Sequence, residues 1–262
     1  MISQRTIFTD DGIACGYRIA GSVERTVVFV HGVGSTAAIW DRQLEALSAD
    51  YRCVAVELRG NGVPRPEPPA GHISPKGFAR DVLAVADVIG VEAFDFVGCS
   101  LGGVVGFELA RMAGHRLRSM CILGSFARYP DADAYAERIT QAVATAGSMR
   151  AFAEMRAAQL GLPPDRLEET IEQMACKNVS CYEAATIATW TNDYRDTLSS
   201  IHVPTLVAYG KNDAVAPAAL SQEIAKGIPG ARLIEIPDAG HVANADNPRA
   251  FNALLKEFLA SV

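Results

Sequence analysis

The sequence predicts an α/β fold in which a mostly parallel sheet is covered by helices on both faces. Short apolar runs that end in turn residues alternate with segments whose apolar residues recur every three or four positions. The strand-like runs are continuously apolar, which strands buried on both faces of a sheet require. One long stretch in the middle of the chain contains only helix-like segments, which predicts a helical insertion into the alternating pattern.

The alternating elements follow one another along most of the chain. The first segment predicts an antiparallel hairpin that turns at Asp11-Gly12. Parallel strands are expected at residues 26–32, 52–60, 94–98, 119–125, 204–210 and 232–237. Amphipathic helices are expected at residues 37–48, 74–90, 101–114, 219–228 and 248–260.

The region from residue 126 to residue 200 lacks any strand-like run. Its helix-forming segments are residues 131–146, 149–161, 164–178 and 180–190. Folds of this class bind ligands outside the carboxyl ends of their parallel strands. We therefore expect a core made of residues 1–125 and 201–262, with residues 126–200 forming a helical cap over that edge of the sheet.

The composition excludes several classes of function. A net charge of -6 over 262 residues, with no basic stripe, disfavours nucleic acid and anionic membranes as partners. The first residues show no basic-then-apolar signal, and no apolar run reaches the length of a membrane span. The six cysteines are scattered, and the nearest pair, Cys176 and Cys181, lacks the further ligands that zinc needs. We therefore expect a cytoplasmic protein without a metal site.

The most specific motif is Gly-Cys-Ser-Leu-Gly, which matches G-x-S-x-G between an expected strand and an expected helix. Such a turn presents the hydroxyl of Ser100 above the sheet, and side chains at Gly98 or Gly102 would collide with neighbouring backbone. Ser100 is therefore the candidate nucleophile. The N–H of Leu101, in the first turn of the helix, is expected to face the oxyanion that forms on attack. Cys99 is a rival nucleophile, but we expect it to pack, because it lies one residue from the apex.

A second oxyanion donor is expected in the loop His31-Gly32-Val33, after the first parallel strand. Val33 is the candidate, because the preceding His-Gly pair brings its backbone over the site. In other enzymes the loss of one such donor lowers turnover about a hundred- to a thousand-fold. His31 could act as a base, but we expect it to hold the loop instead.

An acid and a base are expected downstream of Ser100, because a serine nucleophile needs an adjacent histidine held in the right tautomer. Asp213 lies just past the end of an expected strand, and His241 lies in the loop before the final helix. The order nucleophile, acid, histidine is the one that accompanies a strand–turn–helix serine. Asp238 and Asp246 are less suitable acids, because neither follows a strand end in the required position.

Together these motifs resemble the α/β-hydrolase family. The resemblance covers nearly the whole chain, through HGVGS at 31–35, ELRGNG at 57–62, GCSLGG at 98–103, YGKNDAVAP at 209–217 and DAGHVANADNP at 238–248. The final third looks particularly like β-ketoadipate enol-lactonases and related small bacterial esterases. The resemblance implies an α/β-hydrolase fold and a serine hydrolase that cleaves a small or medium ester or lactone through an acyl-enzyme, without metal or organic cofactor.

Other functions remain open on the same residues. They could hydrolyse a carbon–carbon bond in a diketone or transfer an acyl group to an acceptor other than water, and a non-catalytic ligand-binding protein is a further alternative. The cap would select the substrate. The candidates for lining its pocket are Trp190, Tyr182, Met149, Phe152 and Met155. Large apolar and aromatic side chains such as these are more often part of a core than pocket lining. The sequence does not indicate an oligomeric state.

Overall fold

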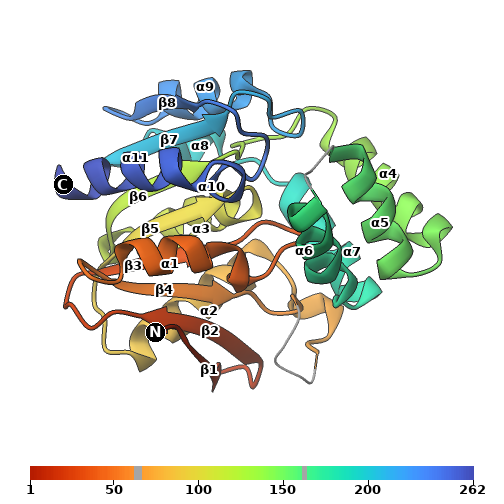
Figure 1. The fold of residues 1–262 in the computed structure, drawn as a ribbon, viewed down its shortest axis with the longest axis horizontal. Coiled ribbons are helices and arrows are strands. Elements are labelled where there is room, and N and C mark those ends of the chain that lie inside the picture. The colour runs from red at the N-terminus through yellow and green to blue at the C-terminus, as the bar shows by residue number, and fades with distance from the viewer. Residues whose placement is uncertain (62–66, 161–163) are drawn as a thin grey trace.

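In the part of the chain that the structure describes, an eight-stranded sheet forms the centre (Figure 1). The computed structural model describes residues 1–61, 67–160 and 164–262, with the backbone alone at residues 159, 160, 164 and 165. The strands are β1 (Ser3–Phe8), β2 (Ala14–Ala20), β3 (Thr26–Val30), β4 (Arg52–Glu57), β5 (Phe94–Cys99), β6 (Leu117–Leu123), β7 (Thr205–Gly210) and β8 (Arg232–Ile236). Across the sheet they lie in the order β1-β2-β4-β3-β5-β6-β7-β8.

The sheet is antiparallel at one edge and parallel elsewhere. β1 and β2 pair as the expected hairpin, and β2 pairs antiparallel with β4. The remaining pairs, from β4 to β8, are parallel. The hairpin turns at Asp11-Gly12, where Gly12 has a φ of +76° that favours glycine. Because the parallel strands run in one direction, the loops after their carboxyl ends meet at one edge of the sheet.

Helices cover both faces of the sheet, as predicted. Along β3, Val28 and Val30 pack into one core, whereas Val27 and Phe29 pack into another on the opposite face. The first face is covered by α2 (Pro75–Val88), α3 (Leu101–Ala113), α8 (Arg195–Leu198) and α9 (Ala218–Gly227). The second is covered by α1 (Asp41–Leu47) and α11 (Pro248–Ala260). Short helices η1 (Ala37–Trp40), η2 (Ala70–His72), η3 (Gly114–Arg116) and α10 (Ala243–Asp246) lie in the connections.

Two strands differ from their expected form. The strand expected at residues 52–60 ends at Glu57, because the chain then turns: the Asn61 N–H donates to the Leu58 carbonyl oxygen, and Gly60 has a φ of +76°. β8 is not buried on both faces, because it forms an edge of the sheet and most of its residues are exposed. The edge position explains the charged residues in its sequence.

Four helices between β6 and α8 lie together beyond the carboxyl ends of the parallel strands, at the right of Figure 1. They are α4 (Ala132–Ala146), α5 (Met149–Leu160), α6 (Pro164–Ala175) and α7 (Val179–Trp190), called the cap helices below. Their apolar side chains form a small core of their own, with Val143, Met149, Phe152, Ala153, Ala157, Ile171, Met174 and Tyr182. Among the described helices, none is both long enough and apolar enough to span a membrane.

Candidate active site

Ser100 lies at a strained turn between β5 and α3. Its φ is +55° and its ψ is -114°, a combination that residues with a side chain rarely adopt. Two hydrogen bonds hold the turn. The Ser100 N–H donates to the Leu123 carbonyl oxygen at 2.9 Å, and the Ser100 carbonyl oxygen accepts from the Ser125 hydroxyl at 2.8 Å. Such strain persists where the surroundings determine the conformation, and it is common at functional sites.

Two glycines permit this turn. A Cβ atom on Gly98 would lie 2.3 Å from the Gly102 carbonyl oxygen, and one on Gly102 would lie 2.2 Å from the Val30 carbonyl oxygen. Both distances are far shorter than van der Waals contact, so only glycine lets the backbone segments approach. The structure therefore has the close backbone approaches that the G-x-S-x-G spacing predicts, and a side chain at Gly98 or Gly102 would collide with them.

His241 and Asp213 form a hydrogen-bonded pair. Nδ1 of His241 lies 2.9 Å from Oδ2 and 3.1 Å from Oδ1 of Asp213. The Asp213 side chain is fully buried, and its Oδ1 also accepts from the N–H groups of Val215 and Ala216, at 2.9 and 2.8 Å. An ionised carboxylate only accepts hydrogen bonds, so this pairing favours the tautomer of His241 with the proton on Nδ1, in which Nε2 can accept a hydrogen bond.

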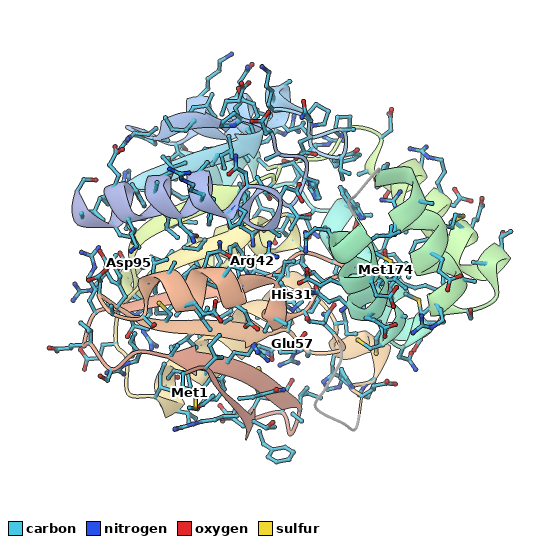
Figure 2. The ribbon with its side chains drawn as sticks, viewed as in Figure 1. Met1, His31, Arg42, Glu57, Asp95 and Met174 are labelled. Carbon is cyan, nitrogen blue, oxygen red and sulfur yellow. The ribbon has the colours of Figure 1, made fainter. Side chains whose placement is uncertain are left out.

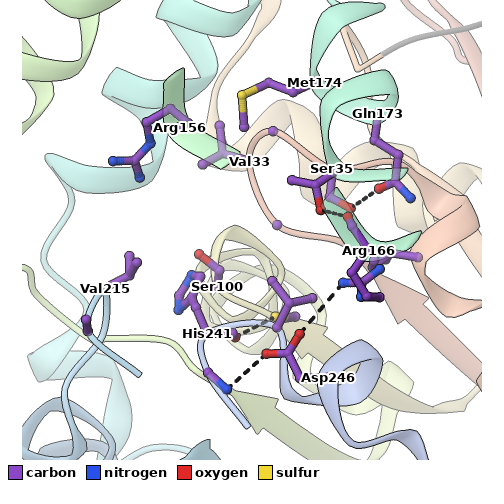
Figure 3. A pocket seen from close by; sticks show the side chains of 18 of the residues that line it. Val33, Ser35, Ser100, Arg156, Arg166, Gln173, Met174, Val215, His241 and Asp246 are labelled. Carbon is purple, nitrogen blue, oxygen red and sulfur yellow. Dashed lines mark hydrogen bonds and ion pairs between the residues drawn. The ribbon is translucent and has the colours of Figure 1, made fainter. Parts of the chain in front are cut away.

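Ser100 and His241 line the same cavity and lie next to each other in Figure 3. No hydrogen bond joins the Ser100 hydroxyl to His241 in the described structure; contacts of this kind often tighten only when substrate binds. Cys99 is buried, and its Sγ faces the His241 carbonyl oxygen at 3.8 Å. Burial raises the pKa of the Cys99 thiol well above its ordinary value. The thiol therefore stays protonated at neutral pH, which makes it a poor nucleophile.

The two residues predicted as oxyanion donors flank Ser100. Leu101 begins α3, so its N–H lies at the positive end of the helix dipole. Gly32 brings the other loop against the serine, since a Cβ on Gly32 would lie 3.2 Å from Ser100 Cβ. The N–H groups of Val33 and Leu101 donate to no other group in the described residues. They are therefore available to an anionic oxygen.

His31 holds the loop that follows β3. Its Nδ1 lies 2.9 Å from the Gly32 carbonyl oxygen, and its Nε2 accepts from the Leu58 N–H at 3.2 Å. Oε1 of Glu57 lies 3.3 Å from Nε2, and Oε2 accepts from the Ala37 N–H at 2.9 Å. Figure 2 shows His31 and Glu57 at the end of the core that faces the cap helices. The His31 ring is fully buried and does not line the cavity, which agrees with the expected structural task.

Two side chains from the cap bind the same loop, and sequence analysis missed both. The Ser35 hydroxyl donates to Oε1 of Gln173 at 2.7 Å. Nζ of Lys177 donates to the Ser35 carbonyl oxygen at 2.6 Å and to Oδ1 of Asn61 at 3.1 Å. Lys177 is 5% exposed, and burial lowers the pKa of its ammonium group. A buried cation needs hydrogen-bond partners, so Lys177 ties the cap to the loop that carries Val33.

Asp246 fixes the loop that carries His241. Its Oδ2 accepts from the Gly240 N–H at 2.9 Å, and its Oδ1 lies 3.8 Å from the guanidinium of Arg166 on α6. From the other side, a Cβ on Gly210 would lie 2.1 Å from the Gly240 carbonyl oxygen, so the loop packs directly on the end of β7. Asp246 therefore positions the histidine loop and contacts the cap.

These groups surround a cavity of about 560 Å³ between the sheet edge and the cap helices, a size that suits a small organic ligand. Tyr182 and Trp190 line it, as expected. Met149, Phe152 and Met155 are not among its lining residues. Met149 and Phe152 are buried in the small core of the cap helices, and Met155 lies 39% exposed on the outer surface of α5. The expectation that these three line the pocket is therefore wrong.

The arrangement brings together the groups that acyl transfer requires. A hydroxyl lies beside an imidazole, a buried carboxylate orients that imidazole, and two backbone N–H groups flank the hydroxyl. In the described ranges, no group of three or more histidine, cysteine, aspartate or glutamate side chains is placed to hold a metal ion.

This fold and this arrangement are those of α/β hydrolases, and residues 27–254 match the alpha/beta hydrolase family, to which the chain belongs. It is 34% identical to RutD of Azorhizobium caulinodans, a proposed carbamate hydrolase, over 88% of this chain and 89% of that protein. It is 29% identical to the pimeloyl-acyl-carrier-protein methyl ester esterase of Neisseria meningitidis serogroup C, over 91% and 94% of the two chains. The solved enol-lactonase of Burkholderia xenovorans LB400 matches with a TM-score of 0.88 at 27% identity, covering 98% and 100%. The predicted family and fold class are confirmed.

Proposed function

We propose that the protein hydrolyses a carboxylic ester or lactone of small or medium size through an acyl-enzyme formed on Ser100. The observation that carries the proposal is the His241–Asp213 pair at 2.9 Å, with His241 beside Ser100 in the cavity. A serine is a weak nucleophile at its ordinary pKa and needs such a base. The strained backbone at Ser100 supports the same role.

The mechanism has two steps. In the first, the Ser100 hydroxyl attacks the carbonyl carbon while Nε2 of His241 takes its proton, and Asp213 stabilises the imidazolium. The N–H groups of Val33 and Leu101 hold the oxyanion, and His241 then protonates the leaving alkoxide as the carbon–oxygen bond breaks. In the second step, His241 takes a proton from a water molecule that attacks the acyl carbon. The acid leaves, and Ser100 recovers its proton.

The relatives support an ester bond as the target. The methyl ester esterase and the enol-lactonase act, by their names, on an ester and on a cyclic ester. Both bonds join a carbonyl carbon to an oxygen leaving group, which is the bond that the proposed mechanism breaks. The mechanism requires neither a metal ion nor an organic cofactor.

Two further assignments belong to the proposal. Residues 126–200 act as the cap that selects the substrate, because α4–α7 lie over the cavity, and residues 1–125 and 201–262 act as the catalytic core. The protein works in the cytoplasm. Buried free thiols, which a reducing compartment preserves, support this location at Cys15, Cys53, Cys99 and Cys121.

A fluorophosphonate probe, with p-nitrophenyl acetate and butyrate as substrates, tests the proposal on the wild type and on Ser100→Ala. We expect labelling and hydrolysis by the wild type and loss of both in the variant, with turnover lower on the order of a million-fold, as when other serine hydrolases lose their nucleophile. Cys99→Ala, one residue away, is the matched control and should keep its activity.

Each other outcome points to a different function. Esterase activity that survives in Ser100→Ala would contradict the proposal. Labelling of the wild type without ester hydrolysis would favour carbon–carbon bond cleavage by the same residues. A wild-type protein that shows neither labelling nor hydrolysis would favour a ligand-binding protein on this fold.

A further inference from the structure

Two arginines from the cap helices line the cavity, and their surroundings differ. Arg166, at the start of α6, is almost completely buried; it forms an ion pair with Glu169 and lies 3.8 Å from Asp246. Arg156, on α5, is partly buried. In the part of the chain that the structure describes, Arg156 forms neither a hydrogen bond nor an ion pair. Among the described side chains, carboxylates thus neutralise Arg166, whereas none forms an ion pair with Arg156.

Arg156 lies across the cavity from Ser100 and His241. Figure 3 shows its side chain on the cap side of the cavity, across from Ser100 and His241. The lining of the same cavity also includes apolar side chains such as Met174 and Val215. A ligand that reaches Ser100 with one end can therefore meet a guanidinium with the other.

No acidic side chain lining the cavity is placed to neutralise Arg156 in the described residues. Asp246 is used by the Gly240 N–H and by Arg166. Asp238 is exposed to solvent, where water and salt screen its charge. A partly desolvated cation beside apolar wall is unfavourable unless an opposite charge joins it. The missing charge can come from the ligand.

We propose that Arg156 binds a carboxylate of the substrate, so that the protein acts on esters or lactones carrying a second, ionised carboxyl group remote from the reacting carbonyl. This inference rests on the proposed function, because it takes the reacting carbonyl to be bound at Ser100. The planar guanidinium offers two parallel N–H donors that match both oxygens of a carboxylate. Binding at the remote end holds the carbonyl near the nucleophile, which converts binding energy into rate.

Pairs of methyl esters that differ in one charge test the inference. Monomethyl adipate carries a carboxylate where methyl hexanoate carries a methyl group, and the monomethyl esters from succinate to pimelate vary the distance between the two ends. The wild type should prefer the anionic member of a pair, with an optimum chain length that reports the span from Arg156 to Ser100. In Arg156→Gln, kcat/KM for the anionic ester should fall about 10- to 100-fold, the loss expected when a charged hydrogen bond is removed.

Hydrolysis of the neutral ester separates a binding role from a structural one. Arg156→Gln should lower kcat/KM for monomethyl adipate much more than kcat/KM for methyl hexanoate, because the neutral ester has no carboxylate that the guanidinium could bind. Arg150→Gln is the matched control: Arg150 lies on the same helix and is exposed, and it pairs with Glu172 at 2.6 Å. Arg150→Gln removes the same charge and should leave kcat/KM unchanged for both esters.

Charge reversal gives the strongest support. Arg156→Glu should reject monomethyl adipate and accept the cationic ester methyl δ-aminovalerate better than the wild type does. If Arg156→Gln leaves the ratio of the two kcat/KM values unchanged, or lowers both equally, the inference is wrong, although hydrolysis through Ser100 still supports the proposed function. If the wild type hydrolyses no ester of either kind, the proposed function fails and the inference fails with it.

Discussion

The two walls of the cavity are built in different ways. The core wall consists of loops whose shape is set by backbone contacts, as at Gly102 and Gly210, where a Cβ atom would lie 2.2 and 2.1 Å from a carbonyl oxygen. The cap wall consists of side chains on helices, such as Tyr182, Arg156 and Met174. A side chain on a helix can be exchanged with little change in the backbone, whereas a loop held by close backbone contacts cannot. The core wall thus suits constant chemistry, and the cap wall suits variable recognition.

The two walls meet at a few polar contacts. Lys177 and Gln173 of the cap hold Ser35, in the loop that also carries Val33. Arg166 of the cap lies 3.8 Å from Asp246, which holds the histidine loop. We therefore expect substitutions in the core wall to have larger effects than substitutions at the contacts between the two walls.

After the loss of the nucleophile itself, the largest effect on the core wall is expected from Asp213→Asn. Its amide can still accept from the N–H groups of Val215 and Ala216, so the loop should keep its shape. An amide N–H facing Nδ1 of His241 would instead favour the tautomer that places the proton on Nε2, where it blocks the base. We expect kcat to fall about ten-thousand-fold, measured with p-nitrophenyl butyrate.

Asp238→Asn provides the control for that change. Asp238 is an exposed aspartate at the cavity that holds neither the histidine nor its loop in the described structure, so its loss should change kcat little. A fall of less than tenfold in Asp213→Asn, with native circular dichroism, would show that Asp213 is not the acid that orients His241.

The next effect is on stability and compares a glycine of the core wall with an exposed glycine at the end of a cap helix. Gly102→Ala places a Cβ 2.2 Å from the Val30 carbonyl oxygen, whereas a Cβ on Gly147, at the end of α4, meets nothing within 4 Å. We expect Gly102→Ala to lower the free energy of unfolding by about 3 kcal/mol or more, because the backbone must move. Gly147→Ala should cost about 1 kcal/mol, from its φ of +74° alone. Urea denaturation measures both, and equal losses would contradict the claim that close backbone contacts set the shape of the core wall.

The fold and the core wall were predictable from the sequence, because local patterns determine them. Continuous apolar runs mark strands buried on both faces, and the glycines around Ser100 follow from the turn that a nucleophile needs. The strand ends that precede Asp213 and His241 then place these two residues at the same edge of the sheet.

The cap wall was less predictable, because it depends on how helices dock on the core. Phe152 and Arg156 lie four residues apart on α5, so they share one side of the helix, yet Phe152 packs within the cap and Arg156 lines the cavity. The spacing of these two residues in the sequence does not indicate which of them packs in the cap and which lines the cavity. The position of Arg156 nevertheless contained a usable indication. It lies on the same side of the helix as Ala153 and Ala157, which are buried, and a charged side chain on a buried face needs an opposite charge or a hydrogen-bond partner.

The smallest effect is expected at the contact between the walls, in Lys177→Met. Methionine fills much of the same space but removes the donor to the Ser35 carbonyl oxygen. The loop that carries Val33 should become less well held, which misplaces one oxyanion donor without removing it. Complete loss of such a donor costs about a hundred- to a thousand-fold in kcat, so we expect a smaller loss, about tenfold, with KM little changed.

The same variant gives a pH dependence of stability whose sign follows from burial. Burial lowers the pKa of Lys177 in the folded protein from the ordinary value of 10.5. Between the lowered pKa and the ordinary one, the unfolded chain binds more protons at this site than the folded chain, so this lysine makes the free energy of unfolding rise with pH. The difference in free energy of unfolding, wild type minus Lys177→Met, should therefore increase as the pH rises towards 10.5, the ordinary pKa of lysine. Urea denaturation measures this difference, in which groups common to both proteins cancel. A flat or falling difference would mean that Lys177 is not desolvated, and that the cap holds the Val33 loop less tightly than the contacts of Lys177 with Ser35 and Asn61 imply.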